Sequence, residues 1–208
     1  MKTELNILNE NLKNLETINN LDLSKTQLFI VDINNGFCKN GNLYSKRLED
    51  LINPIVTFVE SVHNDINKIT AFTDHHTKDS IELLSYPDHC LDDTIECEIV
   101  DELKVFDKIE VVKKNSTNGF FALKDFSFEG IENIVIIGDC TNICVYQLAI
   151  TLKTYFNENN ISKEIIVPMD LVDTYHIDEI HPAEFLNTIF LNSMIQNGVK
   201  VVKKIEMA

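Results

Sequence analysis

The sequence has few glycines and prolines, no tryptophan, and far fewer basic than acidic residues. Its 208 residues include six glycines and four prolines. No glycine falls in a G-x-G-x-x-G or G-x-x-x-x-G-K-[ST] pattern, so we expect no nucleotide cofactor. The sequence has only 18 Lys and Arg but 33 Asp and Glu, which gives a net charge of −15. That charge disfavours nucleic acid and anionic membrane surfaces as partners.

Long apolar runs and an export signal are also missing. No run reaches the length of a membrane span, and the N-terminal segment lacks the continuous apolar core of a secretory signal. The five cysteines are an odd number, which does not suggest a disulfide framework. We therefore expect reduced thiols in a cytoplasmic protein, and any of them could be a nucleophile.

The N-terminal part, residues 1–24, carries an amphipathic pattern. Leu5, Leu8, Leu12 and Leu15 recur at steps of three and four, which predicts one apolar face of a helix. We expect this helix to pack on the surface of the following domain, residues 25–208. A dimer contact is the alternative.

From residue 25 onward, short apolar strands alternate with helices. Strands are predicted at residues 27–33, 68–73, 110–114, 133–138, 164–169 and 199–202, and helices at 46–64, 144–157 and 182–196. This alternation is typical of parallel sheets covered on both faces. We predict a three-layer αβα domain of the α/β class, with a Rossmann-like, mostly parallel six-stranded sheet. Ligands of such sheets bind at the carboxyl ends of the strands.

Acidic and imidazole side chains follow the first two predicted strands. Asp32 ends the first strand, and Asp74 and His76 follow the second, with Glu82 and His89 a few residues later. Asp74 and His76 can face the same way on an extended segment. A mixed oxygen and nitrogen set suits Zn²⁺, Mn²⁺ or Fe²⁺. The alternative is a polar loop whose side chains only cap the backbone.

The segment IVIIGDCTNICV places Cys144 at the start of a predicted helix. Unpaired N–H groups and the positive end of the helix dipole favour a thiolate there and could hold an oxyanion. Asp32 as base, with Lys113 or Lys114 as cation, would complete a nucleophilic site. The alternative is that Cys144 is an ordinary small buried side chain.

Four blocks in order, FIVDINNGF, TDHH…YPDHC, VVKKNSTNGF and IIGDCTNICV, resemble the isochorismatase-like cysteine hydrolases, and among them the nicotinamidases. The resemblance spans about residues 26 to 205. It implies Asp32 as general base, Cys144 as nucleophile and Lys114, in preference to Lys113, as the catalytic lysine. It also implies an oxyanion hole from the backbone N–H groups of Cys140 and Cys144, with a cis peptide before Cys140.

The same resemblance implies a metal and a substrate pocket. Asp74, His76 and His89 match the nicotinamidase metal ligands, and Glu82 falls where some members carry a fourth. Phe37 and Tyr86 match positions of aromatic walls around a pyridine ring. One divalent ion is implied, zinc first, with manganese or iron as alternatives.

The activity that the resemblance implies is hydrolysis of nicotinamide to nicotinate and ammonia through a cysteine thioester, a step in NAD metabolism. The segment after Asp32, the run after Lys114 and the tyrosine at Tyr86 depart from the family pattern, and these departures concern the substrate pocket. Another small amide or carbamoyl compound is therefore an alternative substrate. A non-catalytic small-molecule-binding protein is a further alternative. The resemblance also implies assembly into a homo-oligomer.

Overall fold

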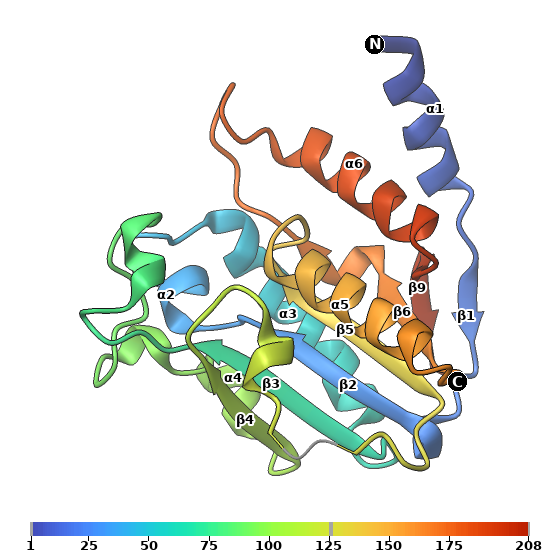
Figure 1. Cartoon of the computed structure of the whole chain (residues 1–208), viewed down its shortest axis with the longest axis horizontal. Helices are drawn as coiled ribbons and strands as arrows, with labels where there is room; N and C mark the ends of the chain where they lie inside the picture. The colour runs from blue at the N-terminus through green and yellow to red at the C-terminus, as the bar shows by residue number, and fades with distance from the viewer. Residues whose placement is uncertain (1, 125–126, 208) are drawn as a thin grey trace.

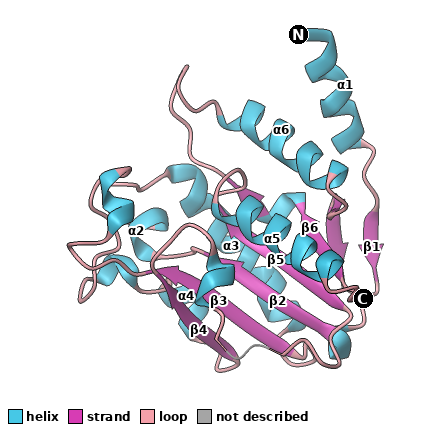
Figure 2. Cartoon of the chain, in the orientation of Figure 1, coloured by secondary structure: helices cyan, strands magenta, loops and turns pink. Residues whose placement is uncertain are grey.

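The computed structural model describes residues 2–124 and 127–207. The two predicted parts, residues 1–24 and 25–208, begin at Met1 and end at Ala208, and these two residues lie outside the described ones. The three-layer α/β fold is confirmed, with a central sheet between two layers of helices (Figure 1). Figure 2 shows the same arrangement by secondary structure. No helix among the described residues is both long and apolar enough to cross a membrane.

The central sheet has seven strands, and all of its pairs are parallel. Six run in the order β4-β3-β2-β5-β6-β8, and β7 pairs with β5. Their bounds are β2 Thr26–Val31, β3 Lys68–Asp74, β4 Ile109–Lys114, β5 Asn133–Asp139, β6 Glu164–Pro168, β7 Val172–Asp173 and β8 Lys200–Val202. The predicted count of six was one too low because β7 has only two residues, too few for a periodic pattern.

Apolar side chains that alternate along β2 supply both cores. Leu28 and Ile30 face one core, which contains the buried side of α3, whereas Phe29 and Val31 face the other, which contains that of α5. The helices are α1 Lys2–Lys13, α2 Asn35–Cys38, α3 Lys46–Val62, α4 Asp101–Lys104, α5 Cys144–Glu158 and α6 Ala183–Gln196. A strand buried on both faces reads as a continuous apolar run, as the sequence of β2 does.

The N-terminal part is only partly helical. Helix α1 ends at Lys13, and residues Thr17–Asn19 form β1, which pairs with β9, Lys204–Glu206, in a separate two-stranded sheet. Helix α1 lies against α6 (Figure 1), where Asn192 donates a hydrogen bond to the Leu8 carbonyl at 3.2 Å. Leu12 is buried in the core beneath. The leucine face thus packs on the chain's own surface.

Two neighbouring strands approach very closely where they end. Gly138 on β5 lies opposite Val31 on β2 and has a φ of +113°. A Cβ at this glycine would lie 2.1 Å from the Val31 carbonyl oxygen. Glycine therefore permits an approach that no other residue could make. The contact brings Asp32, which follows β2, and Asp139, the last residue of β5, to one edge of the sheet.

Candidate active site

Three side chains predicted to be catalytic meet at the carboxyl edge of the sheet. Lys114 ends β4, and its Nζ lies 2.8 Å from Asp32 Oδ2 and 4.0 Å from Cys144 Sγ. All three residues are buried. Lys113 is exposed, so the structure brings Lys114 rather than Lys113 to the other two. This distinction follows from the alternation of side chains along a strand.

The local backbone directs Asp32 into this cluster. Asp32 has a φ of +55°, and its N–H donates to the Phe72 carbonyl of β3 at 3.0 Å. The left-handed conformation is uncommon for residues other than glycine, although Asp tolerates it better than most. The chain therefore turns at Asp32, at the point where β2 stops.

Burial controls the protonation of this cluster. It raises the pKa of Asp32 to about 7, although the Lys114 ammonium acts in the opposite direction. Burial opposes the charged form of Lys114, but the Asp32 and Asp74 carboxylates hold its pKa well above the ordinary value. Burial also raises the pKa of the Cys144 thiol well above its usual range, with partial relief from Lys114. Burial and the start of helix α5 thus act on the Cys144 thiol in opposite directions, and the expected thiolate at the helix start stays a prediction.

The four predicted metal ligands also come together. One ligand atom from each of Asp74, His76, Glu82 and His89 lies within 4.8 Å of the others. Asp74 Oδ2 lies 3.6 Å from His76 Nε2 and 3.5 Å from His89 Nε2, and Glu82 Oε1 lies 3.9 Å from His76 Nε2. Asp74 ends β3, and its other oxygen, Oδ1, pairs with the Lys114 ammonium. Asp74 thus faces the predicted metal ligands through Oδ2 and contacts Lys114 of the cysteine site through Oδ1.

Outer contacts orient both imidazoles so that Nε2 faces the cluster. His89 Nδ1 lies 2.7 Å from the Pro87 carbonyl, which can only accept, so Nδ1 is the donor of this contact and Nε2 is directed at the cluster. His76 Nδ1 lies 3.0 Å from Asn115 Oδ1, which also accepts from Ser80 Oγ at 2.7 Å. His76 Nε2 is buried without a hydrogen-bond partner among the described residues. Such a set fits a divalent transition-metal ion.

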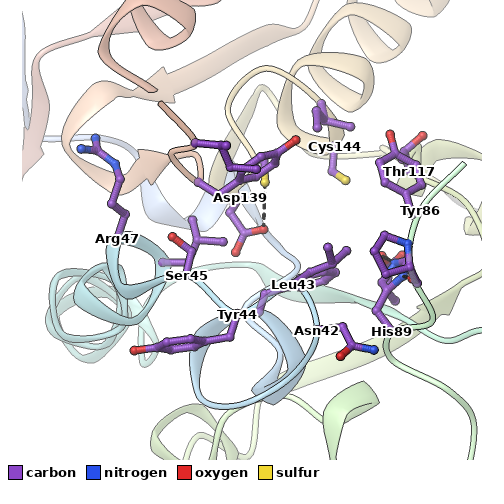
Figure 3. Close-up of a pocket in the computed structure, with 18 of the residues that line it drawn as sticks. Asn42, Leu43, Tyr44, Ser45, Arg47, Tyr86, His89, Thr117, Asp139 and Cys144 are labelled. Carbon is purple, nitrogen blue, oxygen red and sulfur yellow. Dashed lines mark hydrogen bonds and ion pairs between the residues drawn. The ribbon is translucent and has the colours of Figure 1, made fainter. Parts of the chain in front are cut away.

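A cavity of about 620 Å³ opens onto both clusters. Figure 3 shows Tyr86, Thr117 and His89 on one side of the Cys144 thiol and Asp139, Ser45 and Arg47 on the other. The predicted aromatic walls flank one imidazole, since the ring centroids of Phe37 and Tyr86 lie 5.7 Å and 6.1 Å from that of His89. A flat ring entering beside His89 would meet both.

The turn before Cys144 has the expected backbone geometry. The peptide bond between Asp139 and Cys140 is cis, as the family resemblance implied. The Cys140 carbonyl accepts from the N–H groups of Ile143 at 3.0 Å and Val145 at 3.2 Å. Thr141 donates its N–H to the Asp173 carbonyl of β7 at 3.0 Å. These hydrogen bonds stabilise the turn and connect it to the sheet. Helix α5 begins at Cys144.

Sequence reasoning missed two polar residues of the site. Asn115, which accepts from His76, directly follows Lys114, but nothing in its spacing points to an imidazole 39 residues away. Asp139 is buried at the end of β5 and lines the cavity. It could have been found, because it is an acid at the tip of an apolar strand, as Asp32 is.

Comparison with known proteins agrees with this fold. Residues 26–203 match the family described as the isochorismatase domain, and the chain belongs to that family. No match is found among curated proteins.

Solved structures of similar fold include three hydrolases. An isochorismatase-like hydrolase from Alkaliphilus metalliredigens has a TM-score of 0.68 at 22% identity, covering 88% of this chain and 94% of the other. The N-carbamoylsarcosine amidase from Thermoplasma acidophilum has a TM-score of 0.70 at 21% identity, with 86% and 96% covered. The yeast nicotinamidase has a TM-score of 0.71 at 19% identity, with 86% and 100% covered. At these identities the likeness is one of fold alone.

Proposed function

We propose that the protein is a metal-dependent amidase that converts nicotinamide to nicotinate and ammonia through a thioester on Cys144. The main support for the proposal is that the cysteine site and the predicted metal ligands lie at the same edge of the sheet. Lys114 lies between Asp32 and Cys144 and also pairs with Asp74 of the metal cluster. A nucleophile, its base and an orienting metal would thus act on one substrate.

Asp74, His76 and His89, with Glu82 as a fourth ligand, would hold a divalent ion, with zinc the first expectation. When bound, the ion would hold the pyridine nitrogen of nicotinamide, directly or through water, and so orient the ring. Phe37 and Tyr86 would pack against the ring through apolar contact and offset aromatic stacking.

The reaction on the carboxamide would be carried out by Asp32, Lys114 and Cys144. Asp32 takes the Cys144 proton while the Lys114 ammonium stabilises the resulting charges, and the thiolate attacks the carboxamide carbon. The backbone N–H groups of Cys140 and Cys144 hold the tetrahedral oxyanion. The C–N bond breaks as Asp32 returns the proton to the departing ammonia. Water then attacks the thioester while Asp32 takes one of its protons. The C–S bond breaks, Asp32 passes that proton to the Cys144 sulfur, and the acid product loses its remaining proton to solvent and leaves as nicotinate.

The pKa of Asp32 suits this exchange. A base whose pKa is about 7 both accepts and returns a proton readily near neutral pH. An unperturbed aspartate would be a much weaker acceptor for a buried thiol.

A second candidate is the same chemistry on another small amide or carbamoyl compound. A cavity of about 620 Å³ is in the range that holds drug-sized ligands, more than a single ring with a carboxamide requires. The structural neighbour that is an N-carbamoylsarcosine amidase is consistent with this candidate. Cytoplasmic location and a homo-oligomeric state stay predictions.

The test is ammonia release from nicotinamide, with metal content measured on the same samples. We expect turnover by the wild type and none by Cys144→Ala, with about one metal ion per chain in both. Cys97→Ala is the matched control, because Cys97 is buried outside the cavity and its thiol donates to the Thr94 carbonyl. A folded, metal-loaded wild type that releases no ammonia would exclude nicotinamide, and the assay would move to other amides.

A further inference from the structure

Asp139 is a buried acid on the cavity wall that the proposed mechanism does not use. Its side chain is 1% exposed and lines the cavity. Figure 3 shows it on the side of Cys144 away from His89. A ring bound beside His89 and packed against Phe37 and Tyr86 would leave this half of the cavity unfilled.

The partners of this carboxyl are weak. Its Oδ1 accepts from the Cys140 thiol at 3.7 Å and its Oδ2 from the Cys38 thiol at 3.9 Å. Thiols are poor donors. Within the described ranges, Asp139 makes no ion pair, since the Lys114 ammonium pairs with Asp32 and Asp74. Both oxygens of Asp139 therefore act as acceptors without a strong donor.

Burial without a cation is unfavourable for a carboxylate. Burial raises the pKa of Asp139 well above its usual range, and the Asp32 charge adds to this effect. A cationic group entering the cavity would favour the ionised carboxylate of Asp139, because it would provide both a positive charge and strong N–H donors. The net charge of −15 would also favour the approach of a cation over that of an anion.

We propose that Asp139 is the acceptor of a second subsite, which binds a protonated amine of the substrate. The substrate class is then small aliphatic or aromatic amides that carry an amino group remote from the scissile carboxamide. This inference rests on the proposed amidase function and narrows its second candidate. The carboxamide would lie at Cys144 while the ammonium pairs with Asp139.

The test compares amides that differ only in this group. Glycinamide, β-alaninamide, 4-aminobutanamide and 5-aminopentanamide are each paired with the amide in which a methyl replaces the amine. Binding to metal-loaded Cys144→Ala protein is measured by calorimetry at pH 7, so that turnover does not interfere. We expect at least one amine to bind about tenfold or more tightly than its methyl partner, which is the usual range for a hydrogen bond to a charged group.

Two further substitutions in the Cys144→Ala protein test whether Asp139 causes the preference for the amine. Asp139→Asn keeps the shape but removes the charge, and it should bring the ratio of the two affinities near one. Asp50→Asn removes the same charge from an exposed position on α3 and should leave the ratio unchanged. Equal binding of every pair, or a preference that survives Asp139→Asn, would overturn the proposal.

A crystal structure decides the matter if Asp139→Asn does not fold. With the tightest amine bound to Cys144→Ala, the ammonium should lie within hydrogen-bond distance of the Asp139 carboxylate, and any other position overturns the subsite. Turnover is judged separately on the wild type. Amine preference without hydrolysis of any amide would remove the amidase function and leave the subsite, whereas nicotinamide hydrolysis without amine preference would remove only the subsite.

Discussion

Replacing Lys114 by methionine should destabilise the fold in a pH-dependent way. The Lys114 ammonium lies 2.8 Å from Asp32 Oδ2 and also pairs with Asp74, and all three side chains are almost fully buried. Methionine keeps most of the apolar stem but leaves two carboxyl groups without their cation. Removing one partner of a buried ion pair costs about 3–5 kcal/mol. For a domain of this size that loss lowers the Tm by about 6–20 °C.

The sign of the pH dependence follows from the two carboxyl groups. Lys114 lowers the pKa of both Asp32 and Asp74, so without it both folded-state pKa values rise. A carboxyl whose folded pKa is raised contributes stability that is present below its unfolded pKa and lost as pH rises through the folded value. The variant should therefore lose more stability than the wild type between pH 5 and pH 8. The difference in unfolding free energy should be larger at pH 8 than at pH 5.

Urea unfolding of metal-free protein measures this difference, with Lys113→Met as the matched control. Lys113 precedes Lys114 on the same strand but is exposed, so its substitution should change stability by no more than about 0.5 kcal/mol. The reasoning is refuted if Lys114→Met is as stable as Lys113→Met at pH 7. It is also refuted if the gap between the two variants is the same at pH 5 and pH 8.

Three further predictions concern the backbone, the base and the metal. Gly138→Ala should destabilise or unfold the protein, seen as a lower Tm, because its Cβ would lie 2.1 Å from the Val31 carbonyl oxygen; an unchanged Tm would contradict the close approach. The kcat/KM for an amide substrate should rise as Asp32, with a pKa of about 7, loses its proton, so a profile flat from pH 6 to pH 8 would argue against this base. Asn115→Ala should weaken zinc binding by about 10–100-fold in a chelator competition, because His76 loses the contact that orients it; unchanged affinity would show that this contact is dispensable.

The edge of the sheet could be predicted from the sequence because its residues end strands. Asp32, Asp74 and Lys114 each follow or close an apolar run, and parallel strands bring such positions together. The pairing of Asp74 with Lys114 across β3 and β4 is the direct result of that register. Strand ends in the sequence therefore sufficed to place Asp32, Asp74 and a lysine at this edge, whereas the preference for Lys114 over Lys113 came from the family resemblance.

Features set by distant contacts could not be predicted in this way. The two residues of β7 are too few to carry a pattern, and β1 pairs with β9 across nearly the whole chain. Burial, which raises the pKa of the Cys144 thiol, is not revealed by a helix N-terminus in the sequence. Asn115 reaches His76 only because loops after β3 and β4 meet.

The most direct test of the central claim is to trap the thioester on Cys144. Wild-type protein mixed with an amide that it hydrolyses is quenched in acid within the first turnover, digested and analysed by mass spectrometry. We expect the acyl group of the substrate on the peptide that contains Cys144, and none on the peptides of Cys38, Cys90 or Cys97. Ammonia release without an acyl group on Cys144, or with one on another cysteine, would contradict the account.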